Sequence, residues 1–168
     1  METKFNFNSQ ICTTREQSER LLALGLKKET SDCYYWQETE PMHGEAVGIW
    51  HLETLDSKDN QKHFKYLDKN FGVCLADDEE HYFIPSWSLG RLLEMLPSPI
   101  PISEDLPTFH HYAYLDLSKV SAHYYWEDYD GDERALVSFC GNGFFAAVVD
   151  ATEWLIKEGN FPKEYLEE

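Results

Sequence analysis

Residues 109–140 read FHHYAYLDLSKVSAHYYWEDYDGDERALVSFC, and they give the clearest indication of the fold. It contains three runs rich in aromatic and aliphatic residues, at 109–117, 122–128 and 135–140, with short polar segments between them. Such spacing is typical of strands joined by tight turns. The stretch therefore predicts an antiparallel β-meander near the carboxyl end of the chain.

The first of these runs also predicts which side chains share a face. Successive side chains of a strand point to opposite faces of the sheet. One face then carries aliphatic residues suited to a core, including Ala113 and Leu115. The other face carries His110, Tyr112, Tyr114 and Asp116.

Helical patterns flank the meander. Leucines at 89, 92, 93 and 96 form one apolar stripe, with Ser86 or Ser88 as the cap and Pro97 as the stop. Residues 144–158 are apolar except for one narrow polar stripe, and residues 13–26 combine a capping box with a glycine stop. Together these patterns predict a single α+β domain over residues 1–168, a mostly antiparallel sheet with about three helices packed on it.

The remaining segments are weaker signals. We expect strands at 33–37, 46–52 and 81–84, and a faint one at 71–75. The charged segment 55–70 is expected to be irregular, with a loop tip at 56–60. The segment 97–107 holds four prolines and is interpreted as a stiff strap that lies over the surface within the domain.

The charge of the chain excludes some classes of function. There are 31 acidic residues against 14 lysines and arginines, which gives a net charge of −17. Direct binding of nucleic-acid phosphates or of an anionic membrane is disfavoured, because both require clustered basic residues. No run is apolar and long enough to span a membrane, and the polar N-terminus predicts no signal peptide, so we expect a cytoplasmic protein. A basic protein partner remains compatible with this charge.

The segment 126–134, WEDYDGDER, resembles a calcium loop because Asp128, Asp130 and Asp132 alternate. An EF-hand loop needs glycine at its sixth position and glutamate at its twelfth. Counting from Asp128 puts glutamate and phenylalanine there, and placing Gly131 sixth makes a tryptophan the first ligand. The alternative is a type I′ hairpin turn at Asp130-Gly131, with positive φ at both residues. We favour the hairpin and keep a weak divalent-cation module as an alternative.

Cys140 is the candidate nucleophile. It ends a predicted strand just before a predicted helix, where the helix dipole stabilises a thiolate. His110 or His123 on a neighbouring strand would supply the base of a hydrolase or transferase. The alternative is a packing residue beside ordinary turn glycines. The four cysteines include no C-x-x-C pair, the histidines supply too few ligands for a zinc site, and no phosphate- or dinucleotide-binding motif is present, so we expect no cofactor.

Aromatic residues on the meander form the candidate partner-binding surface. Tyrosine and tryptophan are enriched at the energetic centres of protein interfaces. Helices would cover the surface if they packed on this face instead. The candidate residues are Tyr112, Tyr114, Tyr125, Trp126 and Tyr129.

Three stretches carry a family resemblance: residues 15–36, the segment IPSWSLGRLLEMLP at 84–97, and the glycines at 141 and 143 followed by an alanine-containing helix. This pattern resembles small proteins of unassigned function encoded by prophages and mobile elements of gut Bacteroidetes. The resemblance spans most of the chain. It implies a bacterial cytoplasmic setting and a mobile-element origin, and it carries over no catalytic residue. We therefore expect a non-enzymatic accessory protein that binds another protein through an acidic, tyrosine- and tryptophan-rich surface.

Overall fold

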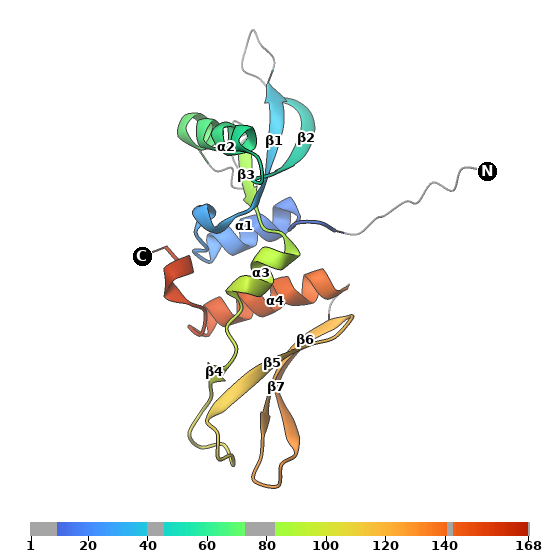
Figure 1. The fold of residues 1–168 in the computed structure, drawn as a ribbon, viewed down its shortest axis with the longest axis vertical. Coiled ribbons are helices and arrows are strands. Elements are labelled where there is room, and N and C mark those ends of the chain that lie inside the picture. Colours follow the sequence, from blue (N-terminus) through green and yellow to red (C-terminus); the bar gives the residue numbers. More distant parts are fainter. Residues whose placement is uncertain (1–9, 40–45, 73–82, 141–142, 168) are drawn as a thin grey trace, which may run out of the picture.

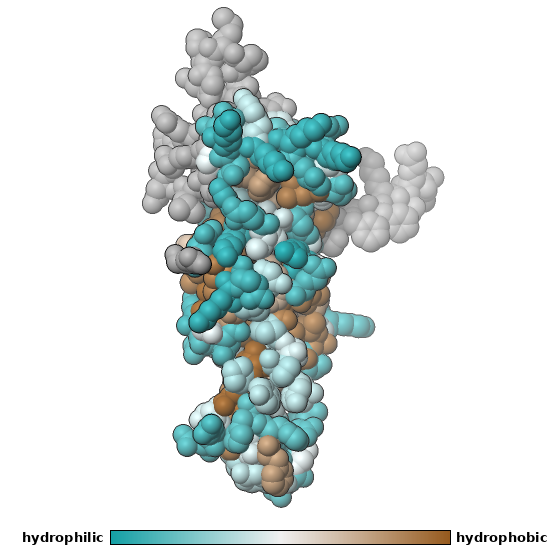
Figure 2. Space-filling model, turned by 60° about the vertical axis from the view of Figure 1, so that its left-hand side comes forward, coloured by the Kyte–Doolittle hydropathy of each residue, from teal (hydrophilic) through white to brown (hydrophobic). Residues whose placement is uncertain are grey.

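The computed structural model describes residues 10–39, 46–72, 83–140 and 143–167. The molecule is elongated, with a small sheet and one helix at one end, helices in the middle and the meander at the other end (Figure 1). One face of the molecule, drawn in Figure 2, is mainly hydrophilic at both ends and shows its hydrophobic residues mostly in the middle. Among the described residues, no helix combines the length and the apolar character needed to cross a membrane.

The first helix, α1 (Arg15–Ala23), begins and ends as its sequence predicts. The Thr14 side chain accepts from the Gln17 amide, and the Gln17 side chain accepts from the Thr14 amide, which is a capping box. Gly25 has φ of 90° and ends the helix in the left-handed region. The Leu26 amide then donates to the Leu21 carbonyl, as in a Schellman stop. A short 3₁₀ turn at Lys28–Thr30, η1, follows.

The first sheet has the order β2-β1-β3 and is antiparallel throughout. Its strands are β1 (Cys33–Thr39), β2 (Ala46–Thr54) and β3 (Phe83–Ser86). The predictions for 33–37 and 46–52 are confirmed. Much of the expected strand at 81–84 and most of that at 71–75 lie outside the described residues, although residues 83 and 84 belong to β3.

The expectation of an irregular segment at 55–70 is wrong, because most of it forms the helix α2 (Lys58–Phe71). The Ser57 hydroxyl caps the helix by accepting from the Asn60 amide. Phe64 and Leu67, one turn apart, pack against Tyr34 of the first sheet. This apolar stripe is narrow, so the surrounding lysines and aspartates concealed the helical period.

Helix α3 (Leu89–Met95) starts at the Ser88 cap and stops before Pro97, as its leucine stripe predicts. The proline-rich strap lies beyond it and contributes the short strand β4 (Ile100–Pro101). This strand pairs with the meander, and the Ile100 side chain is buried in the core. The strap thus joins the middle helices to the second sheet.

The predicted meander is confirmed as a four-stranded antiparallel sheet of order β4-β5-β6-β7. Its long strands are β5 (Tyr112–Leu117), β6 (Ser121–Glu127) and β7 (Glu133–Cys140). The predicted type I′ turn is wrong, since among the described residues only glycines have positive φ. The Asp128 amide donates to the Asp132 carbonyl, and Gly131, with φ of 82°, closes the longer loop between them.

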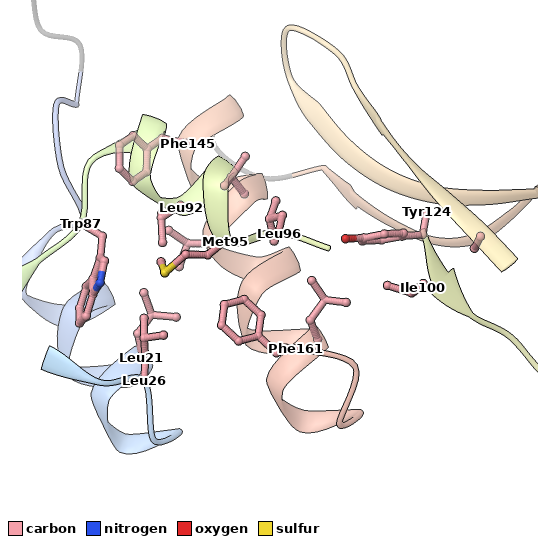
Figure 3. Close-up of a cluster of buried hydrophobic side chains, with 14 of the residues drawn as sticks. Leu21, Leu26, Trp87, Leu92, Met95, Leu96, Ile100, Tyr124, Phe145 and Phe161 are labelled. Carbon is pink, nitrogen blue, oxygen red and sulfur yellow. The ribbon is translucent and has the colours of Figure 1, made fainter. Parts of the chain in front are cut away.

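Helix α4 (Phe144–Lys157) packs on β6 and β7 and also contacts α1 and α3. It is followed by a second 3₁₀ turn at Lys163–Tyr165, η2. Figure 3 shows the main core between these helices and the buried face of the second sheet, with Leu92 and Met95 of α3 near Phe161 and with Tyr124 reaching in from β6. A smaller cluster lies between α2 and the first sheet.

The α+β class is therefore confirmed, with antiparallel pairing in both sheets of the described residues. The described part of the chain contains four α-helices rather than about three, because α2 was not expected. It also contains two separate sheets, where the sequence suggested one mostly antiparallel sheet.

Candidate functional site

The outer face of the second sheet is open. Alternation along β5 directs Ala113 into the core and Tyr112 and Tyr114 outward, where they are 50% and 41% exposed. Helix α4 packs against the opposite face, through contacts such as those of Ala147 and Ala151 with Ala122. Helix α4 lies on the other side of this sheet, and the outward tyrosines are 41–50% exposed, so none of the described helices covers them. The prediction of which side chains share a face is confirmed along β5.

A hollow of about 310 Å³ lies on this outer face. The Tyr114 and Tyr125 residues face one another across β5 and β6, with ring centroids 6.2 Å apart and planes tilted by 41°. We call the lining of this hollow the tyrosine face. It consists of His110, Tyr112, Tyr114, Tyr125 and Glu127.

A second aromatic pair lies at the tip of the second sheet. The rings of Phe109 and Tyr129 meet edge to face, with centroids 4.6 Å apart. Both side chains are more than half exposed. The Tyr129 amide is fixed by donation to the Pro107 carbonyl of the strap. Tyr129 is thus exposed, as its candidate role in binding requires.

Trp126 does not belong to this surface. It lies one residue from Tyr125, so its side chain points to the buried face of β6 and is only 8% exposed. There it is part of the main core. The prediction that Trp126 is a partner-binding residue is therefore wrong, because side chains alternate along the strand and Trp126 faces away from Tyr125.

The acidic segment forms a tied-down hairpin loop. The Asp128 carboxylate accepts from the Asp130 and Asp132 amides at 3.0 Å and from Arg134 Nε at 2.8 Å. The amide of Asp132, followed by the Arg134 guanidinium, holds the pKa of the Asp128 carboxyl below its usual value. These bonds use the oxygens that a cation would need. Asp130 and Asp132 remain at the surface, where they add negative charge beside the tyrosine face.

Cys140, His123 and Asp116 share the open face but lie on three different strands. His123 Nε2 is 2.8 Å from Asp116 Oδ2 on β5. On β7, Ser138 is directly opposite His123, whereas Cys140 is opposite Ser121. Cys140 is thus a diagonal neighbour of His123, and such positions are typically about 7–8 Å apart.

His110 takes no part in this group. The register pairs His123 with Asp116, near the far end of β5, whereas His110 precedes the strand and lines the tyrosine face. His110 and His123 therefore do not lie opposite each other across the strand pair. The described residues contain no group of three or more histidine, cysteine, aspartate or glutamate side chains placed to hold a metal ion.

A larger hollow of about 630 Å³ lies between the first sheet and α3, and sequence reasoning did not find it. Its polar groups hold the fold together. Asp32 accepts from the Ser88 amide at 2.7 Å and from the Ser88 hydroxyl, while Arg91 Nε donates to the Thr30 carbonyl at 2.8 Å. These side chains anchor the start of α3, so their chemistry is structural.

An aromatic and histidine cluster between α2 and the first sheet was also missed. The Tyr34 hydroxyl is 3.0 Å from His63 Nδ1, and the Trp36 ring stacks on His51 at 4.6 Å. Burial lowers the pKa of His63, partly offset by the negative charge of Glu53. Finding this cluster required knowing that α2 is a helix.

Two further cysteines lie in the interior. Cys12 and Cys33 are both buried. The interaction with the Cys12 thiol, followed by burial, raises the pKa of Cys33. Cys140, by contrast, is exposed. Of the described cysteines, only Cys140 is thus placed to meet a molecule from solution.

Comparison of the chain with protein-family models, with curated proteins and with solved structures finds no match. The assignment of a function therefore rests on the residues and on the geometry described above.

Proposed function

We propose that this chain is a non-enzymatic accessory protein of a bacterial mobile element, acting in the cytoplasm, and that it binds another protein through the tyrosine face. The observation that carries the proposal is the exposure of Tyr112 and Tyr114 on a sheet face that the packed helix leaves open. Tyrosine offers a large, rigid contact area and loses little conformational entropy on binding, and it is enriched at interface hot spots.

The rigidity of this surface supports the proposal. The strands that display the tyrosines pair along their length, and their inner face packs on α4. A partner would therefore meet side chains whose backbone is already ordered, and preorganisation reduces the free-energy cost of association. A second exposed aromatic pair, Phe109 and Tyr129, lies at the tip of the same sheet.

Charge supports a basic partner. The tyrosine face includes Glu127, the adjacent loop carries Asp130 and Asp132, and Glu133 of β7 lies opposite Glu127. The whole chain has a net charge of −17. Complementary charge accelerates association and disfavours acidic competitors, and its effect falls as salt rises.

The test is a capture experiment with matched variants. The double variant Tyr114→Ser, Tyr125→Ser removes the central ring pair, and Tyr66→Ser removes a 57% exposed tyrosine from α2 at the other end of the molecule. A protein captured from the producing cell is then purified and its affinity is measured. We expect the double variant to bind at least about tenfold more weakly, and Tyr66→Ser to bind as the parent does. The absence of any specific partner at low and high salt would contradict the proposal.

A cysteine-dependent hydrolase or transferase is the second candidate function. It is favoured by the bond between Asp116 and His123, which orients the imidazole on the face that also carries exposed Cys140. Hydrolysis of a small activated ester separates the two candidates. Turnover that disappears in both Cys140→Ser and His123→Asn would support catalysis, and turnover that survives either change would dismiss it.

A further inference from the structure

We infer that the tyrosine face is a receptor for a single arginine side chain of the partner, whose guanidinium group enters the hollow. This inference rests on the proposed function and specifies the chemistry that the partner must present. It follows from the kinds of group that line the hollow, from their geometry and from where the chain's own cations lie.

The lining groups suit a cation. The hollow is lined by three tyrosines, a histidine and Glu127, so aromatic and acidic residues border it. The face of an aromatic ring is electron-rich and attracts a positive charge that lies within about 6 Å of its centre. The carboxylate adds a direct charge partner. An apolar group placed here would instead desolvate Glu127 without compensation.

None of the described lysines and arginines lines the hollow. The five lining residues include neither lysine nor arginine. Arg134, on the neighbouring strand, binds Asp128 at 2.8 Å and Asp132 at 3.5 Å. Two other arginines already lie over rings, Arg15 at 4.5 Å from the centre of Trp50 and Arg91 at 5.8 Å from that of Tyr165. The lining of the hollow therefore suits a cation that a partner supplies.

Geometry favours arginine over lysine. The Tyr114 and Tyr125 rings are tilted by 41°, so a flat group can stack on one ring while its edge reaches the second. A guanidinium is planar, keeps its charge at all accessible pH values and can donate two parallel hydrogen bonds to one carboxylate. The ammonium of lysine is compact and more strongly hydrated, so it gains less from an open aromatic surface.

The experiment uses the full chain with 13C-labelled tyrosine rings. The protein is titrated with three peptides whose termini are blocked and therefore uncharged. The peptides are Gly-Gly-Xaa-Gly-Gly, with arginine, lysine or citrulline at the centre; citrulline keeps the shape of arginine but lacks its charge. Ring signals of Tyr112, Tyr114 and Tyr125 are followed by NMR during titration. The Tyr66 ring on α2 serves as the internal control.

We expect the arginine peptide to shift the three ring signals with a dissociation constant on the order of 1–10 mM, as befits one side chain. Citrulline should bind at least about tenfold more weakly, and lysine several-fold more weakly. Glu127→Gln should weaken arginine binding about fivefold, whereas Glu158→Gln, at the exposed end of α4, should leave it unchanged.

Equal binding of citrulline, equal binding of lysine or an equal response of Tyr66 would overturn the inference. The absence of any shift at about 50 mM peptide, roughly five- to fiftyfold above the expected dissociation constant, would overturn it as well. The outcome for the proposed function is separate. A captured partner that depends on Tyr114 and Tyr125 although the arginine peptide does not bind would sustain the proposed function and reject only the arginine receptor. If no captured partner depends on Tyr114 and Tyr125, the proposed function is rejected, whether or not the arginine peptide binds.

Discussion

The Tyr124 hydroxyl donates a 2.6 Å hydrogen bond to the carbonyl of Pro97, which ties the centre of the second sheet to the start of the proline-rich strap. Tyr124 is fully buried, in the main core. The contact therefore connects the strands that display the tyrosine face to the helices of the middle of the molecule.

Tyr124→Phe should lower the free energy of unfolding by about 1–2 kcal/mol, because the partly buried Pro97 carbonyl loses the hydrogen bond from the Tyr124 hydroxyl. Urea denaturation measures the change. Tyr125→Phe is the matched control, since that neighbouring ring points to the outer face, and it should leave the midpoint unchanged. Equal midpoints for both variants would contradict the assigned contact.

Stability should fall in alkaline solution because of the buried tyrosines. Burial raises the pKa of Tyr34 to about 12 and raises the pKa of Tyr124 further. In the unfolded chain a tyrosine releases its proton near pH 10. The folded state thus holds these protons longer, so stability is complete below pH 10 and declines as the pH rises from 10 through 12. In an absorbance titration, part of the tyrosinate signal should appear only at the highest pH values. It should appear together with the loss of the near-ultraviolet circular dichroism signal. Full ionisation of all tyrosines without unfolding would refute it.

The Asp128 loop should contribute to stability without calcium. Asp128→Ala removes the acceptor of two backbone amides and of Arg134, so the melting temperature should fall. Because the pKa of Asp128 is lowered in the folded state, its contribution is present above about pH 4 and is lost as the pH falls through the folded value. The difference between parent and variant should therefore shrink in acid.

Calcium provides the control for that loop. Millimolar calcium should leave the melting temperature of the parent protein unchanged, since the Asp128 oxygens are already engaged. A calcium-dependent rise that disappears in Asp130→Asn would restore the cation module that we have set aside.

The described cysteines should differ in reactivity. Cys140 is exposed, whereas Cys12 and Cys33 are buried. Iodoacetamide should therefore modify Cys140 at least about tenfold faster than the buried pair, which reacts only when the structure opens. Mass spectrometry of digests after timed labelling gives the order. Early labelling of Cys12 would show that the N-terminal segment does not stay packed.

The sequence predicted those elements whose signals are local. Ser88 and Pro97 delimit α3, and Gly25 ends α1, because caps and stops act within one turn. The outward positions of Tyr112 and Tyr114 followed from the two-residue period of a strand. Helix α2 was missed because only a narrow stripe, such as Phe64 and Leu67, contacts its neighbours.

The candidate site needed the structure for a different reason. The tyrosines of β5 are exposed only because α4 packs on the opposite face of the sheet. That packing depends on contacts between residues distant in sequence, such as Ala122 with Ala147. The register that separates His110 from His123 also depends on strand pairing, which the sequence does not show. Trp126 was assigned to the partner-binding surface because it is aromatic, although the alternation of side chains places it on the face opposite to Tyr125.

The central claim is that Tyr114 lies at the contact with a protein partner, and site-specific cross-linking tests it most directly. A photoreactive phenylalanine analogue is placed at position 114 in one sample and at position 66, on α2, in another. Illumination of the producing cells should join a single discrete partner to the protein labelled at position 114 and not to the one labelled at position 66. Equal cross-linking from both positions, or none from position 114, would contradict the account.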